Sequence, residues 1–192
     1  MLATFARTIA FSFAAGINLY ATVAVLGLAA RYDWVELPPQ FDVFAHPVVI
    51  AVALVLYVVE FVADKVPWVD TAWDAVHTVI RPLGGALIAV AALGEASLPV
   101  EGLMALLGGG VAATTHFTKA GTRAMANASP EPFSNWALSL AEDGLVVGLA
   151  FIALRWPVAS LAVVVTLLAL MAFFAAAIVR GVRRRWKKGI EN

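Results

Sequence analysis

Six stretches of this sequence are long and apolar enough to cross a lipid bilayer, or come close to it, and this feature constrains the fold more than any other. A bilayer core about 30 Å thick takes about 20 apolar residues in helical form. The stretches are residues 2–30, 47–63, 83–98, 102–117, 136–154 and 158–179. We interpret the first stretch as a retained helix, because its apolar run is longer than the core of a signal peptide.

Composition excludes most other fold classes. Hydrophobic residues make up 62% of the 192 positions and charged residues only 14%. So few charges cannot cover the surface of a water-soluble domain of this size. A disulfide scaffold is excluded because the chain has no cysteine. The sequence therefore predicts an all-α fold, a polytopic membrane helix bundle of about six transmembrane helices that forms a single domain over residues 1–192.

Basic residues are distributed unevenly between the two ends of the predicted spans. With six spans and a cytoplasmic C-terminus, 11 of the 13 Lys and Arg residues fall on the cytoplasmic side, and only Arg31 and Arg155 fall outside. Cytoplasmic loops of membrane proteins are enriched in Lys and Arg. We therefore expect a multi-pass protein of the inner (plasma) membrane, with both termini cytoplasmic and a basic tail at residues 180–192.

Residues 66–81 form an amphipathic segment between the second and third spans. Its polar face carries Asp70, Asp74, His77 and Arg81, at spacings of three and four residues. The segment is too short and too charged to span, so we expect an interfacial or re-entrant helix on the cytoplasmic side. A second polar segment, residues 118–135, occupies the corresponding place later in the chain. This correspondence suggests an internal duplication with halves at residues 1–82 and 83–154.

Eleven polar and ionisable side chains are candidates for a ligand site or an ion path. They are Asn18, Glu60, Asp70, Asp74, His77, Arg81, His116, Lys119, Arg123, Glu142 and Asp143. A charged side chain inside a span is costly and marks an ion or proton path by default. These side chains also have ordinary structural interpretations. Glu60 can form an ion pair with Lys65 or Arg81, and the polar face of residues 66–81 can be a solvated surface. Asn18 can form a hydrogen bond between helices.

Three of these groups point to particular chemistry. Asp70, Asp74 and His77 are spaced so that they can ligate a divalent metal, and a metal site is therefore one interpretation of this face. Lys119 and Arg123, surrounded by threonines, can bind an anion or serve as a basic anchor at the membrane boundary. Glu142 and Asp143 fall inside the fifth stretch. Because an unpaired buried charge costs several kcal/mol, we expect at least one of them to pair with Lys119, Arg123 or Arg81.

Small residues suggest close helix packing. Gly144 and Gly148 form a GxxxG pattern, which lets another helix approach closely. That helix can belong to a second copy of the chain, so a homo-oligomer is a further prediction. Residues 108–110 are three consecutive glycines that weaken the fourth stretch and can break it.

Known enzyme motifs are missing from the sequence. It contains no cysteine, no Gly-x-Ser-x-Gly, no HExxH, no P-loop and no dinucleotide fingerprint. Thirteen basic residues balance thirteen acidic ones, so net charge does not point to nucleic acid. We expect no cofactor, and the sequence favours a protein without enzymatic activity, with a metal-dependent membrane enzyme as the remaining alternative.

Four motifs carry a resemblance to a known family. They are Ala-Gly-Ile-Asn-Leu-Tyr at residues 15–20, the long segment at residues 64–85, Lys-Ala-Gly-Thr-Arg at residues 119–123, and Ser-Pro-Glu-Pro-Phe-Ser-Asn at residues 129–135. Over nearly the whole chain the sequence resembles a family of small bacterial multi-pass membrane proteins that is known only as a domain of unknown function. The resemblance implies an all-helical membrane domain and assigns no activity and no site residue.

The convergence of these charged residues on one side of the bundle favours a small permease or channel-like protein that moves a small ion or solute. An alternative is a module that binds or flips an anionic lipid head group through Lys119, Arg123 and Arg81. A second alternative is a membrane scaffold whose charges only pair with one another. Membrane lipids are expected partners in each case.

Overall fold

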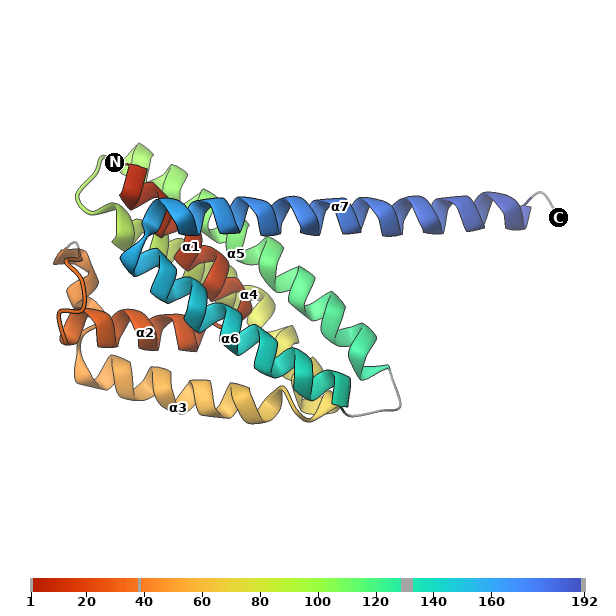
Figure 1. The fold of residues 1–192 in the computed structure, drawn as a ribbon, viewed down its shortest axis with the longest axis horizontal. Coiled ribbons are helices and arrows are strands. Elements are labelled where there is room, and N and C mark those ends of the chain that lie inside the picture. The colour runs from red at the N-terminus through yellow and green to blue at the C-terminus, as the bar shows by residue number, and fades with distance from the viewer. Residues whose placement is uncertain (1, 38, 129–132, 191–192) are drawn as a thin grey trace.

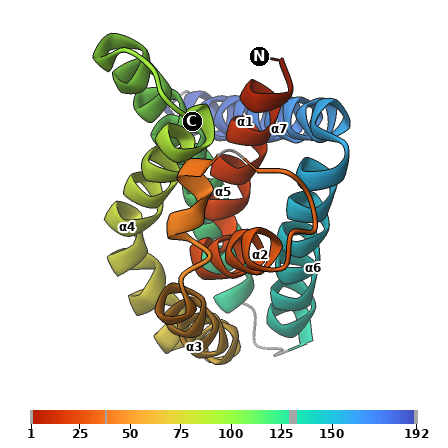
Figure 2. The ribbon, with the colours of Figure 1, turned by 90° about the vertical axis from the view of Figure 1, so that its left-hand side faces the viewer.

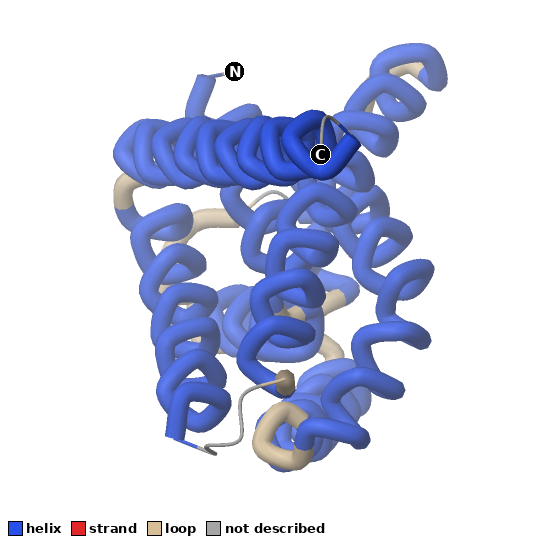
Figure 3. Tube along the Cα trace, turned by 90° about the vertical axis from the view of Figure 1, so that its right-hand side faces the viewer, coloured by secondary structure: helices blue, strands red, loops and turns tan. Residues whose placement is uncertain are grey.

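A computed structural model describes residues 2–37, 39–128 and 133–190 of the chain, and throughout these ranges the regular structure is helical (Figure 3). The elements are α1 (Leu2–Ile17), α2 (Leu19–Arg31), the short 3-10 helix η1 (Pro39–Val43), α3 (Pro47–Ala63), α4 (Pro67–Leu93), α5 (Leu98–Asn127), α6 (Phe133–Arg155) and α7 (Pro157–Ile190). Prolines stand at the first positions of α3 and α4, where the missing N–H costs nothing. The all-α prediction is confirmed.

Helix α1 is the centre of the bundle. It contacts α2, α4, α5, α6 and α7, and every residue from Thr8 to Ile17 is buried. Figure 2 shows α1 and α2 in the middle, with the other long helices around them. Residues with small side chains let the neighbouring backbones approach; Ser12 Oγ, for example, donates a hydrogen bond to the carbonyl oxygen of Gly85 at 3.1 Å.

The first apolar stretch is divided into two helices at Asn18. The backbone of Asn18 is extended (φ −146°, ψ 100°), and its side-chain oxygen accepts a hydrogen bond from the amide of Ala21 at 2.9 Å. Asn18 is therefore the N-cap of α2. The prediction of a single helix over residues 2–30 is wrong, and Asn18 does not lie in the middle of a helix as expected.

The two helices form a hairpin whose outer ends lie at the same end of the bundle. Near the start of α1, Arg7 donates hydrogen bonds to the carbonyl oxygens of Ala153 and Leu154 at the end of α6 (3.3 and 3.1 Å). Near the end of α2, Gly27 packs against Phe44 and Ile50, where α3 begins. The tip of the hairpin, where α1 meets α2, thus points into the bundle (Figure 1), and Asn18 at this tip is buried.

Helix α4 joins two segments that we expected to be separate. It runs without interruption from Pro67 to Leu93, through Pro82, so the prediction of a distinct interfacial helix at residues 66–81 is wrong. The polar face of this segment turns towards the other helices, where it finds partners, and not towards water. In the same way α5 passes through the three glycines at residues 108–110 and continues to Asn127. The expected break does not occur.

Four helices, α4 to α7, are long and apolar enough to cross a membrane. Helix α3 is equally apolar but has 17 residues, and α1 and α2 are shorter still. The number of six spans is therefore not confirmed. Helix α7 extends beyond the other helices (Figure 1). The repeat boundary expected at residues 82 and 83 falls inside α4, and the duplication stays a prediction.

Candidate functional site

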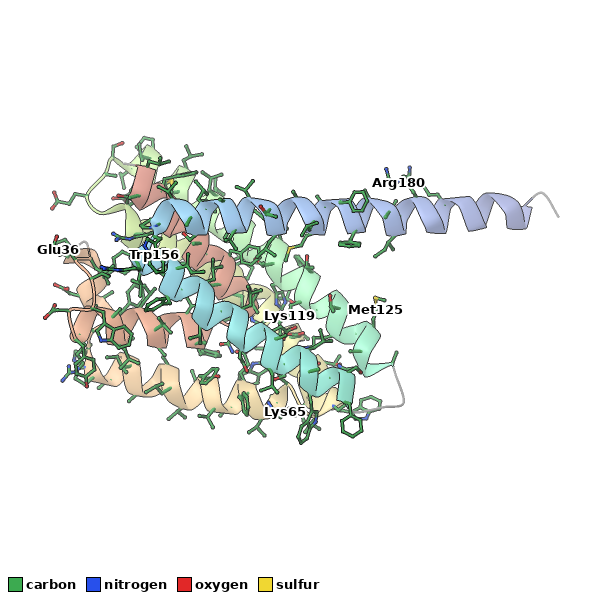
Figure 4. All side chains as sticks on the ribbon, in the orientation of Figure 1. Glu36, Lys65, Lys119, Met125, Trp156 and Arg180 are labelled. Atoms are coloured by element: carbon green, nitrogen blue, oxygen red, sulfur yellow. The ribbon has the colours of Figure 1, made fainter. Side chains whose placement is uncertain are left out.

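Seven charged side chains from α3, α4, α5, α6 and the residue after α3 form a continuous set of ion pairs inside the bundle. We call this set the ion network. Its members are Glu60, Asp64, Asp74, Arg81, Lys119, Arg123 and Glu142. Figure 4 shows Lys119 among the helices, well away from Glu36 and Trp156 at the other end. Most of these side chains are almost inaccessible to solvent, and Arg81 and Glu60 are fully buried.

Arg81 and Lys119 both bind Glu60 on α3, and each also binds a second carboxylate. Arg81 Nη2 lies 2.8 Å from Glu60 Oε1, and its Nη1 lies 3.2 Å from Asp74 Oδ1. Lys119 Nζ lies 3.3 Å from Glu60 Oε1 and 3.2 Å from Asp64 Oδ2. The same ammonium donates to the carbonyl oxygen of Ile17 at 3.2 Å. Lys119 therefore connects the ion network to the tip of the α1–α2 hairpin.

Arg123 makes the most extensive set of contacts. Its Nε and Nη2 both contact the carboxylate of Glu142, the shortest distance being 2.6 Å. Its Nη2 also lies 2.8 Å from Asp64 Oδ2, and its Nη1 donates to Asn135 Oδ1 at 2.8 Å. A guanidinium in such a fork is held tightly because it has several planar donors. The predicted pairing of Glu142 with a cation is confirmed.

The partners of His116 assign its protonation. Its Nδ1 lies 2.8 Å from Arg81 Nη1, and a guanidinium can only donate, so Nδ1 accepts. His116 Nε2 therefore carries the proton and donates to Thr78 Oγ1 at 3.1 Å. The Thr78 hydroxyl in turn donates to the carbonyl oxygen of Asp74 at 3.1 Å. This chain of donors holds His116 as a neutral imidazole.

His77 has a different set of contacts. Its Nδ1 lies 2.7 Å from the carbonyl oxygen of Trp73 and must donate to it. Its Nε2 shares a hydrogen bond with the hydroxyl of Tyr20 on α2, at 2.8 Å. The rings of Trp73 and His77 stack at 4.6 Å. His77 thus anchors α4 to the hairpin, apart from the ion network.

Asp70 and Asp143 lie beside the ion network without joining it. Asn18 Nδ2 donates to Asp143 Oδ1 at 3.2 Å, and Asn127 Nδ2 donates to Asp70 Oδ2 at 2.7 Å. Within the described ranges neither carboxylate has a Lys or Arg within ion-pair distance. In this part of the chain, each carboxylate has a side-chain amide as its partner.

Lys65 does not pair with Glu60, which was one of the alternatives from the sequence. Its ammonium donates to the carbonyl oxygen of Phe61 at 2.8 Å and to Ser139 Oγ at 3.2 Å. It also lies over the Phe61 ring, 3.0 Å from the centroid. Partial burial lowers the pKa of Lys65, while the carboxylates of Asp143 and Asp64 act in the opposite direction.

A cavity of about 170 Å³ lies between α4 and α5, next to the ion network. Its walls are formed by Asp70, Thr71, Asp74, Ala75, Thr78, Ala120, Arg123, Ala124 and Asn127. This volume holds several water molecules, each of which occupies about 30 Å³ in the liquid. Across the parts of the chain that the structure describes, no group of three His, Cys, Asp or Glu side chains is arranged to hold a metal ion.

Several contributors were not among the candidates from the sequence. Asp64 stands four residues after Glu60 and Asn127 four residues after Arg123, so helical spacing could have indicated both. Asn135 precedes the fifth apolar stretch, and Tyr20 lies within the first. Both belong to motifs that carry the family resemblance, but those motifs do not indicate their partners, which come from distant segments.

Comparison with known proteins gives a match to one family model. Neither the curated proteins nor the solved structures contain a match to this chain. One family model, described as "Domain of unknown function (DUF4126)", matches residues 5–177. This match covers most of the sequence, including every member of the ion network. The chain therefore belongs to the DUF4126 family of domains of unknown function.

Proposed function

We propose that this helical membrane protein is a small permease or channel-like protein whose path passes the ion network at the tip of the α1–α2 hairpin. One observation carries the proposal. A helix broken inside the bundle meets a buried cluster of charges, through the contact of Lys119 with the carbonyl oxygen of Ile17. Transporters commonly build their sites from broken helices, whose free carbonyl and amide groups face the solute.

The energetic cost of the ion network supports a functional role. Taking charges out of water costs several kcal/mol per ion, and apolar packing would stabilise a bundle at lower cost. Charged side chains within membrane spans usually face a path for ions, protons or solutes. The cavity between α4 and α5 provides access to Asp74 and Arg123, two members of the network.

The alternatives from the sequence receive less support. Arg81, Lys119 and Arg123 each contact at least two carboxylates, so their charge is already compensated and a lipid phosphate would have to displace an ion pair. A scaffold whose charges only pair would not leave Asp70 and Asp143 without a cation. A homo-oligomer stays a prediction; Gly144 and Gly148 have open space in front of them, as such an interface needs.

The proposal includes an orientation with α3 to α7 as spans and the α1–α2 hairpin as a re-entrant element. One end of the protein contains Arg7, Arg31 and Arg155. The opposite half of the protein contains the other ten of the 13 basic residues. The positive-inside rule then places the C-terminus in the cytoplasm and the N-terminus outside.

Cysteine labelling in intact cells tests this orientation against the six-span interpretation. The chain has no cysteine of its own, so single replacements report cleanly. With an impermeant thiol reagent we expect Ala3→Cys and Glu95→Cys to react and Arg183→Cys to be protected. Six spans would instead protect Ala3→Cys. Protection at position 3 together with reaction at position 95 would contradict the hairpin.

Ion flux into vesicles tests the permease itself. The purified protein in liposomes is expected to move at least one of H⁺, Na⁺ and K⁺ faster than vesicles without protein, as measured with ion-sensitive dyes. Glu60→Gln removes the charge that binds Arg81 and Lys119, and we expect flux to fall at least about tenfold, the effect of about 1.4 kcal/mol on a barrier.

Asp42→Asn is the matched control for the flux experiment, because Asp42 is exposed and lies outside the bundle. It should leave flux unchanged. The proposal is wrong if none of the three ions moves faster than in empty vesicles, or if Glu60→Gln conducts like the parent protein.

A further inference from the structure

We infer that the cavity between α4 and α5 binds one alkali-metal cation, with the Asp70 carboxylate as its main ligand. The inference names the class of ion for the path proposed above. Its role in transport rests on that proposal, but binding itself does not. The cavity is lined by Asp70, Asp74, Thr78 and Asn127, among others.

The first step is a pair of oxygens that lack a partner. Asp70 is 1% exposed, and only its Oδ2 receives a hydrogen bond, from Asn127. Asp70 Oδ1 and Asn127 Oδ1 are both buried and have no hydrogen-bond partner in the described part of the chain. Buried polar atoms of this kind are costly unless something binds them. Both residues line the same cavity, so one bound species can contact both oxygens.

The second step is the charge of the cavity. Its lining contains the carboxylates of Asp70 and Asp74 and the guanidinium of Arg123, which gives a net charge of −1. Arg123 is already engaged by Glu142 and Asp64, and Arg81 neutralises Asp74. Among the lining residues, Asp70 is the carboxylate that forms no ion pair in the described ranges, and a single positive charge would balance it.

The third step is the type of ligand atom. Carboxylate, amide and hydroxyl oxygens bind hard cations, whereas nitrogen and sulfur ligands select transition metals. A divalent ion such as Mg²⁺ or Ca²⁺ would change the net charge of the cavity lining from −1 to +1. The small side chains of Ala75, Ala120 and Ala124 keep space for an ion with part of its water. Oxygen ligands with one excess negative charge therefore fit Na⁺ or K⁺.

Thermal unfolding of the purified full chain in detergent tests the inference. NaCl or KCl replaces N-methylglucamine chloride at constant ionic strength. We expect one of the two cations to raise Tm saturably, by about 2–4 °C at about five times its Kd. Asp70→Asn keeps the shape of the side chain and should abolish this rise. The exposed Asp42→Asn should retain it.

A direct measurement of cation binding tests the inference even if Asp70→Asn does not fold. Equilibrium dialysis with radioactive ²²Na⁺ or the K⁺ analogue ⁸⁶Rb⁺ is expected to give one site per chain, and Asn127→Ala should weaken the affinity about tenfold. The inference is overturned if the parent protein gains no stability from either ion, if Asp70→Asn and Asn127→Ala bind as tightly as the parent, or if stability responds to pH and not to the ions.

The binding and flux experiments separate the two proposals. A protein that binds the cation but moves no ion contradicts the permease and leaves the cation site. A protein that conducts, but is stabilised by neither cation, contradicts the cation site and leaves the permease.

Discussion

Arg123→Gln is expected to lower the free energy of unfolding by about 3–5 kcal/mol, the largest effect of any single replacement considered for this protein. The guanidinium is 1% exposed and binds Glu142 and Asp64 at 2.6 and 2.8 Å. Glutamine cannot neutralise these carboxylates, so buried negative charge would be left with Lys119 as its nearest cation. Chemical unfolding in detergent, followed by tryptophan fluorescence, measures the loss.

A double replacement shows whether charge or packing causes this loss. Arg123→Gln combined with Glu142→Gln should recover part of the stability, because the carboxylate left unpaired is then neutral. Arg155→Gln is the matched control, since Arg155 is exposed at the end of α6 and should cost less than about 1 kcal/mol. Equal losses for Arg123→Gln and Arg155→Gln would show that the ion network is not buried in the folded protein.

Gly108→Ala is expected to destabilise the protein by about 1–3 kcal/mol or more, because α4 and α5 leave no space for a methyl group there. A Cβ at Gly108 would contact Ala89, would lie 2.7 Å from the carbonyl oxygen of Gly85 and would lie 2.8 Å from Ser12 Oγ. The Cβ of Ala89 and the backbone carbonyl of Gly85 cannot rotate out of the way. The helices would have to separate, which would also displace α1.

Gly110→Ala, two residues further along the same helix, is the control. A Cβ at Gly110 meets nothing within 4 Å. Alanine is the better helix former by about 1 kcal/mol, so this variant should be as stable as the parent or more stable. Thermal melting of the two variants side by side makes the comparison. If Gly108→Ala had the same Tm as Gly110→Ala, this result would contradict the close approach of α4 and α5.

The helices that are apolar throughout were predictable from the sequence. Residues 47–63 became α3 with the same bounds, and the two later stretches became α6 and α7 with extended ends. Pro47 and Pro157 fix the starts of α3 and α7, because proline is tolerated at the first position of a helix and not in its interior. The contact of Glu142 with a basic residue was also predictable, since buried charge requires compensation.

The hairpin and the continuous α4 were not predictable, for a shared physical reason. Asn18 lies in an apolar stretch that suits a helix on both sides, and it caps α2 because Asp143 holds its side chain from another segment. The polar face of α4 looks like a solvated surface in sequence. It is buried because Arg81 finds Glu60 on α3, 21 residues away. The sequence offered this ion pair as one alternative for Glu60, but local patterns do not show that it turns the whole polar face of α4 inward.

The central position of α1 has a consequence for the order in which the protein is assembled. The amino-terminal segment is synthesised first, yet Ser12, Asn18 and Arg7 bind groups located 73, 125 and up to 147 residues later. Contacts over such separations form late, because the intervening chain must be in place before they can form. The hairpin therefore docks last, after α4, α5 and α6 have packed together and formed the site that it occupies. A nascent chain that stops before residue 155 would display its first 31 residues undocked, and these would be open to proteases and chaperones until synthesis resumed.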